Sequence, residues 1–165
     1  MTRAGKIIAV ATLALAAFGI WWLFFPGDQR VIRSRVEKIA RLASVGAGES
    51  QILRVSKTER LVDMLAADVG VSLEGTGADF TSFAGKDQFA EGLRVARLRA
   101  RQAKVQLLDV VFDSEPDGQQ AVTRMAALAE VDGEQNRVAQ EIRISWRKVD
   151  GQWLIAKIET VKSRR

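Results

Sequence analysis

Few residue types in this chain could carry chemistry, because its 165 residues include no His, Tyr or Cys. Their absence excludes the Ser-His-Asp and Cys-His arrangements, as well as histidine and cysteine metal sites and disulfide bonds. Carboxylates, amines, guanidinium groups, hydroxyls and amides are left for catalysis or binding. We therefore expect no metal site and no cofactor, and the composition weighs against an enzyme.

Two aspartates lie where a carboxylate could act on a bound ligand. Asp109 interrupts the alternating apolar face of Val105, Leu107 and Val111, and Asp63 lies beside the apolar stripe of a predicted helix. Burial raises the pKa of a carboxyl group and can make it a general base. A simpler interpretation places both aspartates in solvent, at a strand end or a helix edge. The candidate pocket residues are Asp63, Met64, Asp109 and Gln140, of which Gln140 is more simply explained as a hydrogen-bonded core amide.

Arginines gather on one side of a predicted helix over residues 86–101, whose other side carries Phe89 and Leu93. The functional interpretation is contact with an anionic partner through Arg94, Arg97 and Arg101. The simpler interpretation is a solvated helix face. Nucleic acid is not an expected partner, because removing the N-terminal Arg3 and Lys6 leaves 23 basic against 20 acidic residues.

The segment from Ile7 to Phe25 contains nineteen residues without a charge and is followed by Pro26-Gly27. This length just suffices for a helix to cross the apolar part of a bilayer. We expect residues 1–27 to be an uncleaved membrane anchor that contacts the lipid bilayer. The alternative is a cleaved signal peptide, but no small-x-small cleavage site follows the apolar segment.

The predicted location is the inner (plasma) membrane, with a single span and with residues 28–165 on the extracytoplasmic side. The short basic N-terminus is typical of a signal anchor. Basic residues soon after the span oppose this orientation, since positive charge near a span favours the cytoplasm. These residues are Arg30, Arg33, Arg35, Lys38 and Arg41.

The remaining 138 residues suffice for one domain. Hydrophobic periodicity predicts helices over 29–44, 51–68 and 86–101, a short strand over 69–73 and a Gly-rich loop over 75–85. From residue 104 the period changes to two, which predicts strands over 104–114, 120–131, 137–149 and 152–162. Helices followed by an antiparallel meander indicate an α+β fold. The apolar stripe of the first helix predicts that it packs on the sheet rather than on a membrane surface.

The last hairpin allows two registers. A two-residue Asp150-Gly151 turn would pair Ile144 with Lys157 and mix polar and apolar faces. A three-residue turn with Gly151 in a bulge pairs Ile144 with Ala156 and gives one apolar face. The sequence therefore favours the three-residue turn.

The order of these elements, the closing hairpin WRKVDGQWLIA over 146–156 and the helix entry GKDQF over 85–89 resemble the nuclear transport factor 2-like superfamily. The superfamily includes ketosteroid isomerase and the SnoaL-like polyketide cyclases. The resemblance covers residues 29–162 and implies a cone of three helices packed on a curved, mostly antiparallel sheet, with an apolar pocket. Enzymes of this superfamily use Asp, His and Tyr, and this chain has neither His nor Tyr.

We accordingly expect a non-catalytic, membrane-anchored interaction or assembly module that could form a homodimer or join a membrane protein complex. The alternative is a protein that binds a small apolar ligand, or that performs isomerase- or cyclase-like chemistry on one with a pocket carboxylate.

Overall fold

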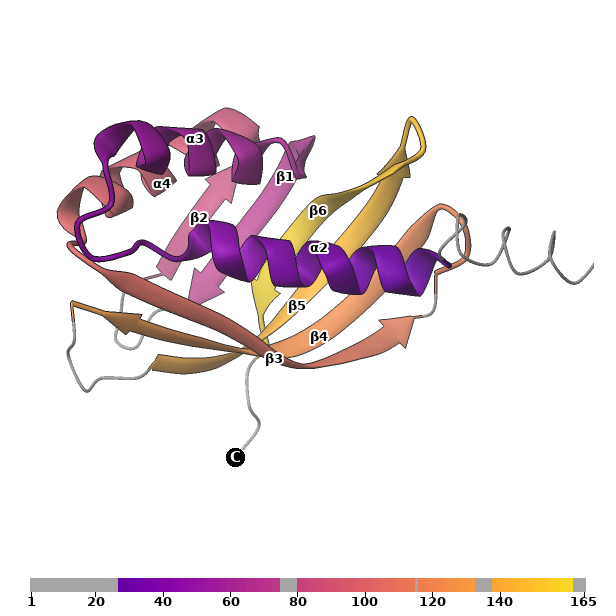
Figure 1. Cartoon of the computed structure of the whole chain (residues 1–165). Coiled ribbons are helices and arrows are strands. Elements are labelled where there is room, and N and C mark those ends of the chain that lie inside the picture. The colour runs from indigo at the N-terminus through magenta and orange to yellow at the C-terminus, as the bar shows by residue number, and fades with distance from the viewer. Residues whose placement is uncertain (1–26, 75–79, 115, 133–137, 162–165) are drawn as a thin grey trace, which may run out of the picture.

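The computed structural model describes residues 27–74, 80–114, 116–132 and 138–161, which form an α+β domain (Figure 1). Its elements, in chain order, are α2 (Asp28–Ala43), α3 (Gln51–Val62), β1 (Leu65–Glu74), β2 (Phe80–Ala84), α4 (Lys86–Arg99), β3 (Ala103–Ser114), β4 (Gln120–Val131), β5 (Val138–Val149) and β6 (Gln152–Thr160).

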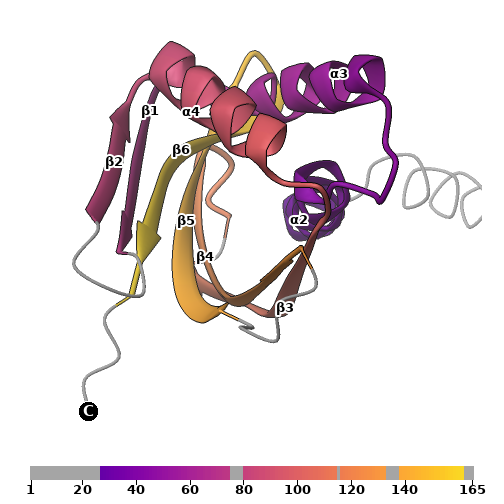
Figure 2. The same cartoon turned by 90° about the vertical axis from the view of Figure 1, so that its left-hand side faces the viewer.

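The six strands form one sheet in the order β2-β1-β6-β5-β4-β3. All neighbouring pairs are antiparallel except β1 and β6, which are parallel. The sheet curves around α2, α4 packs over β1 and β2, and α3 contacts both α4 and α2 (Figure 2). This confirms the predicted α+β class and the arrangement of three helices on a curved, mostly antiparallel sheet.

The predicted membrane anchor lies outside the described residues, apart from Gly27. Among the helices that the structure describes, none is long and apolar enough to cross a bilayer. The anchor therefore stays a prediction from sequence.

Helix α2 crosses the concave side of the sheet. Ile32 and Val36, one helical turn apart, are 0% and 2% exposed, as the predicted apolar stripe requires. The Asp28 carboxylate accepts hydrogen bonds from the Trp153 Nε1 group at 2.8 Å and from the Lys148 Nζ group at 2.9 Å. The N-cap residue is Gly27, and the Asp28 carboxylate fastens the first turn of α2 to the sheet.

Large side chains fill the space inside the curved sheet. Trp146, Trp153 and Met125 are each 1% exposed and belong to one core cluster with Ile32 of α2. The indole Nε1 group of Trp146 donates to the Thr123 hydroxyl at 2.9 Å, which satisfies both buried polar groups. The described interior of the cone is thus a packed core.

Two predictions for the N-terminal half were wrong. Helix α3 ends at Val62 rather than at residue 68, and β1 already begins at Leu65. Met64, Leu65 and Ala66 are all buried, because this segment enters the sheet beside β6. Strand β2 lies within the predicted Gly-rich loop, where it pairs with β1.

The closing hairpin has the two-residue turn, so the predicted three-residue turn was wrong. Asp150 and Gly151 have φ values of 49° and 77°, the left-handed pair that this tight turn requires. A register shift beyond Trp146 leaves Ala156 as an extra residue, so that Ile144 pairs with Ile158. The bulge restores the apolar face that an unbroken two-residue register would have lost.

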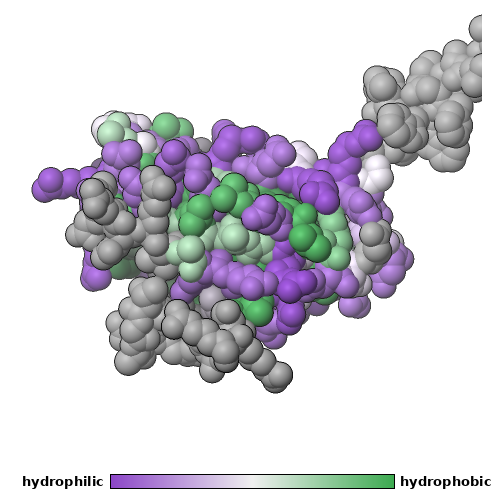
Figure 3. Space-filling view, turned by 90° about the horizontal axis from the view of Figure 1, so that it is seen from below, coloured by the Kyte–Doolittle hydropathy of each residue, from purple (hydrophilic) through white to green (hydrophobic). Residues whose placement is uncertain are grey.

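The outer face of the sheet combines ion pairs with apolar side chains (Figure 3). Asp113 accepts from Arg124 at 2.9 Å and from Arg143 at 3.4 Å, which links β3, β4 and β5. On β3, Leu108 is 43% exposed and Val111 52% exposed. Exposed ion pairs of this kind each contribute about 0–1 kcal/mol, so the face is held mainly by strand pairing.

Candidate ligand-binding cleft

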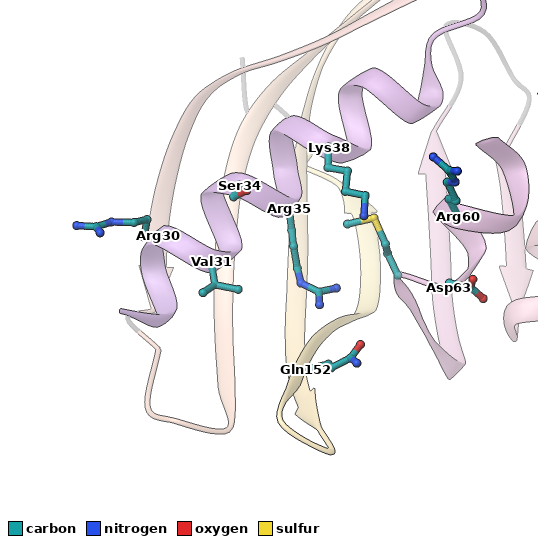
Figure 4. A pocket seen from close by; sticks show the side chains of 9 residues that line it. Arg30, Val31, Ser34, Arg35, Lys38, Arg60, Asp63 and Gln152 are labelled. Atoms are coloured by element: carbon teal, nitrogen blue, oxygen red, sulfur yellow. The ribbon is translucent and has the colours of Figure 1, made fainter. Parts of the chain in front are cut away.

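A cleft of about 630 Å³ opens between α2, the end of α3 and the β5–β6 turn. Figure 4 shows Arg35 and Lys38 extending from α2 into the space that Gln152 faces from the turn. The lining residues are Arg30, Val31, Ser34, Arg35, Lys38, Arg60, Asp63, Met64 and Gln152. Helical geometry explains the α2 contribution, since residues 31, 35 and 38 lie at i, i+4 and i+7 on one face.

Three cations of this cleft have no partner within the described chain. The side chains of Arg35, Lys38 and Arg60 make no hydrogen bond or ion pair with any residue that the structure describes. Arg35 is half-buried, and burial lowers the pKa of its guanidinium group. A partly desolvated charge is costly unless an opposite charge approaches it. An anion in the cleft would supply that charge.

The remaining lining residues define what else a ligand would meet. Met64 is 4% exposed and presents an apolar wall, to which Val31 of α2 adds. Ser34 and Gln152 offer a hydroxyl and an amide that can donate or accept hydrogen bonds. Cations, an apolar wall and a few neutral polar groups together suit a small amphiphile with an anionic group.

Asp63 lies on the edge of this cleft. Its side chain is 78% exposed and pairs with the Lys86 Nζ group at 3.6 Å. Figure 4 shows its carboxylate directed away from Arg35 and Lys38. Asp63 and Met64 thus both line this cleft, but the Asp63 carboxylate faces solvent.

The other two pocket candidates lie elsewhere. Asp109 is exposed and has a φ of 55°, at a register shift between Leu108 and Val111 where β3 bulges. This bulge turns Val111 outward, although the apolar alternation predicted that it faces inward. Gln140 is half-buried on β5 opposite Ala127 and does not line the cleft.

The three predicted arginines of the anionic-partner surface also separate. Arg94 and Arg101 are exposed, but Arg97 is 4% exposed. Its guanidinium group donates to the Leu42 carbonyl at the end of α2 and, at 3.1 Å, to the Arg54 carbonyl of α3. Arg97 is therefore a buried connector of three helices and not part of a surface.

Sequence reasoning did not bring Arg35, Lys38 and Arg60 together as residues of one cleft. The position of Arg35 and Lys38 beside the apolar stripe of α2 could have indicated that they border the sheet. Residues that flank an apolar stripe lie at the edge of the surface on which the helix packs. No local sequence pattern predicts that Arg60 and Gln152 lie across the cleft from Arg35 and Lys38. That juxtaposition comes from the sheet, which brings the β5–β6 turn beside α2.

Comparison with known proteins gives structural likeness only. No family model and no curated protein matches the chain. A candidate aromatic ring hydroxylase of Novosphingobium aromaticivorans has a TM-score of 0.65 at 15% identity, over 84% of this chain and 90% of that one. A candidate scytalone dehydratase of the same organism gives 0.61 at 17% identity, over 83% and 85%.

A further structure from Novosphingobium aromaticivorans, a nuclear transport factor 2-like protein with a cystatin-like fold, gives a TM-score of 0.60 at 16% identity, over 92% of this chain and 86% of that one. This chain has the nuclear transport factor 2-like fold. At such identities the likeness carries architecture and no chemistry, because one fold supports many unrelated functions.

Proposed function

We propose that this protein is a non-catalytic binding module of the nuclear transport factor 2-like fold, which binds a small amphiphile with an anionic group in the cleft beside α2. The observation that carries the proposal is the group of three cations, Arg35, Lys38 and Arg60, that line one cleft without a partner in the described chain. A bound anion would neutralise them, and the Met64 wall would cover the apolar part of the ligand.

The packed interior supports binding over catalysis. The buried polar residues that the structure describes are Thr58, Thr123 and Arg97. The Glu49 carboxylate is also buried, but it pairs with Lys57 at 2.8 Å and does not line the cleft. A general base needs a group within hydrogen-bond reach of a substrate proton, in a site that excludes water. The two candidate carboxylates, Asp63 and Asp109, are both exposed.

Isomerase-, dehydratase- or cyclase-like chemistry is the second candidate function. It is favoured by the position of Asp63 on the cleft wall and by the names of two structural neighbours, which are described as a hydroxylase and a dehydratase. The exposure of Asp63 weighs against it. Turnover that is lost in Asp63→Asn, with ligand binding retained, would favour this second function.

The predicted anchor, Ile7 to Phe25, would hold the module at the inner membrane, where amphiphiles are concentrated. Residue 28 begins α2, so the cleft residues of α2 would follow the span by only a few residues. We further propose, as expected from the sequence, that the module forms a homodimer or joins a membrane protein complex.

The proposal is tested by calorimetric titration of the full chain in nanodiscs of zwitterionic lipid, with empty nanodiscs subtracted. The probes are naphthalene-2-sulfonate and the uncharged naphthalene-2-sulfonamide, which share an apolar body. We expect the sulfonate to bind at least about tenfold more tightly, since one charge-assisted hydrogen bond contributes roughly 1.5–3 kcal/mol.

Charge reversal locates the site. The double variant Arg35→Glu/Lys38→Glu should lose sulfonate binding, whereas Arg41→Glu, an exposed residue of α2 outside the cleft, should not change it. Equal binding of both probes, or unchanged sulfonate binding by the double variant, would refute the proposed site.

A further inference from the structure

Apolar side chains are exposed along the seam between α3 and α4. Of the nine large apolar side chains that are exposed in the described chain, five belong to these two helices. Ile52 is 84% exposed and Leu98 66% exposed, the two highest values of the nine. Single exposed apolar residues need no explanation, but a contiguous group marks an interaction surface.

The two helices enclose a groove of about 510 Å³, here called the α3–α4 groove. Ile52, Val55 and Leu98 give it an apolar lining, and the buried Thr58 and Arg97 contribute to its floor. It is distinct from the cleft beside α2, since the two share no lining residue.

Reciprocal hydrogen bonds fix α3 and α4 relative to each other. The Arg54 guanidinium group of α3 donates to the Arg97 and Ala100 carbonyls at the end of α4, at 2.8 and 2.9 Å. Arg97 of α4 donates in return to the Arg54 carbonyl. A partner therefore meets a preformed surface, which lowers the entropy cost of binding.

The charge around the groove is mainly positive. The segment 92–101 contains four arginines and no acidic residue. Arg97 turns inward, whereas Arg94, Arg99 and Arg101 are exposed. Arg94 lines the groove and pairs with the exposed Glu91 at 3.5 Å. Glu59 is the one acidic residue that lines the groove in the described chain. A partner with negative charge beside its apolar surface would be complementary.

The walls of the groove determine the shape of its occupant. Both walls are helices, whose backbone groups are bonded internally, so an added strand would find no edge to pair with. Exposed apolar residues recur three positions apart on each helix, at Ile52 and Val55 of α3 and at Val95 and Leu98 of α4. Of these four residues, Ile52, Val55 and Leu98 line the groove. This pattern suits apolar residues at i, i+3 or i+4 and i+7 of a third helix.

We propose that the α3–α4 groove binds an amphipathic helix of a partner protein that carries acidic residues beside its apolar stripe. This surface goes beyond the ligand cleft and does not depend on it. It would give the module one site for a small molecule and a second site for a protein.

The test uses two labelled 18-residue helical peptides with the same leucine stripe, one with glutamate and one with lysine at the flanking positions. Fluorescence anisotropy measures their binding to the full chain in zwitterionic nanodiscs, with empty nanodiscs subtracted. We expect the acidic peptide to bind at least tenfold more tightly, with an affinity that falls as salt is added. Ile52→Glu and Leu98→Glu should each weaken it at least tenfold.

The matched control is Val149→Glu, which changes an exposed apolar residue at the end of β5 and should leave peptide binding unchanged. Thermal unfolding of each variant verifies that it is folded, as expected for exposed positions. Equal binding of the two peptides, or full binding by Ile52→Glu, would overturn the proposal. So would a result in which Ile52→Glu abolishes only self-association, because a second copy would then be the occupant.

Discussion

At the scale of single residues, Arg54 and Arg97 connect α2, α3 and α4 through hydrogen bonds to backbone carbonyl groups. The carbonyl groups at the end of a helix have no partner within it, and a cation there also opposes the negative end of the helix dipole. Arg54 supplies these contacts at the end of α4, and Arg97 supplies one at the end of α2. Burial lowers the pKa of the Arg97 guanidinium group, and the buried Glu49 carboxylate, which pairs with Lys57 at 2.8 Å, partly offsets this effect.

Replacing Arg97 with Met should destabilise the domain by about 3–5 kcal/mol, because the substitution leaves buried carbonyl groups unpaired and a buried carboxylate less compensated. Urea denaturation followed by circular dichroism measures the change. Arg94→Met, at an exposed position of the same helix, should cost at most about 0.5 kcal/mol. Equal stability of the two variants would contradict the connecting role of Arg97.

The position of Arg97 shows where sequence reasoning fails at this scale. Four arginines on one side of a helix predict a solvated face, and three of the four are indeed exposed. Which one turns inward depends on where the ends of α2 and α3 lie, and no local pattern encodes that. Asp109 is a similar case, because one extra residue in β3 moved Val111 and its neighbours relative to the predicted faces.

At the scale of elements, α2 is fastened to the hairpin of β5 and β6 by one carboxylate. The hydrogen bond from the Trp153 Nε1 group to Asp28, followed by that from Lys148, holds the pKa of the Asp28 carboxyl below its usual value. The contact joins residues 125 positions apart in the chain. It fixes the first turn of the helix that also lines the ligand cleft.

The lowered pKa of Asp28 predicts a pH-dependent contribution to stability. This contribution is complete above the unfolded pKa, about 3.9, and is lost as the pH falls through the lower folded value. The stability difference between the protein and Asp28→Asn should therefore shrink as the pH decreases from about 6 to about 2. Urea denaturation at a series of pH values measures it, with Glu37→Gln on exposed α2 surface as the control. A difference that is constant with pH would contradict the role of Asp28.

Element types were predictable where hydrophobic periodicity was long. The four C-terminal strands each run for nine to twelve residues, and the predicted ranges differ from them by at most two residues at either end. Strand β2 was missed because its five residues, Phe80–Ala84, are too few to show a period. The hairpin register was missed because the bulge at Ala156 lies five residues beyond Gly151. The turn residues indicate the type of turn but do not indicate a bulge farther along the strand.

At the scale of the whole molecule, α3 separates two surfaces of different character. The α3–α4 groove follows this helix from Gln51 to Glu59, and the cleft beside α2 begins at Arg60. Both depend on α3 being held against the neighbouring helices, by Arg54 and Arg97 at one end and by the buried Leu61 and Met64 at the other. A substitution that loosens the packing of α3 should therefore weaken binding both in the α3–α4 groove and in the cleft beside α2.

The orientation of this molecule in a membrane is the last prediction. The apolar segment Ile7–Phe25 and the short basic N-terminus predict that residues 28–165 are translocated. The basic residues of α2 oppose this orientation, because moving positive charge across the membrane against the membrane potential costs free energy. A reporter that is active only in an oxidising compartment, fused after Arg165, should be active, and a cytoplasm-only reporter at the same position should not.

A charge variant makes this topology test sharper. Adding two lysines before Lys6 strengthens the cytoplasmic signal of the N-terminus and should leave the orientation unchanged, since long domains translocate largely regardless of charge. Activity of the cytoplasm-only reporter in the unmodified protein would show that residues 28–165 face the cytoplasm, the reverse of the predicted orientation. If the added lysines then restored activity to the oxidising-compartment reporter, the basic residues of α2 would be identified as the cause. The ligand and the acidic helix would in that case have to be sought inside the cell.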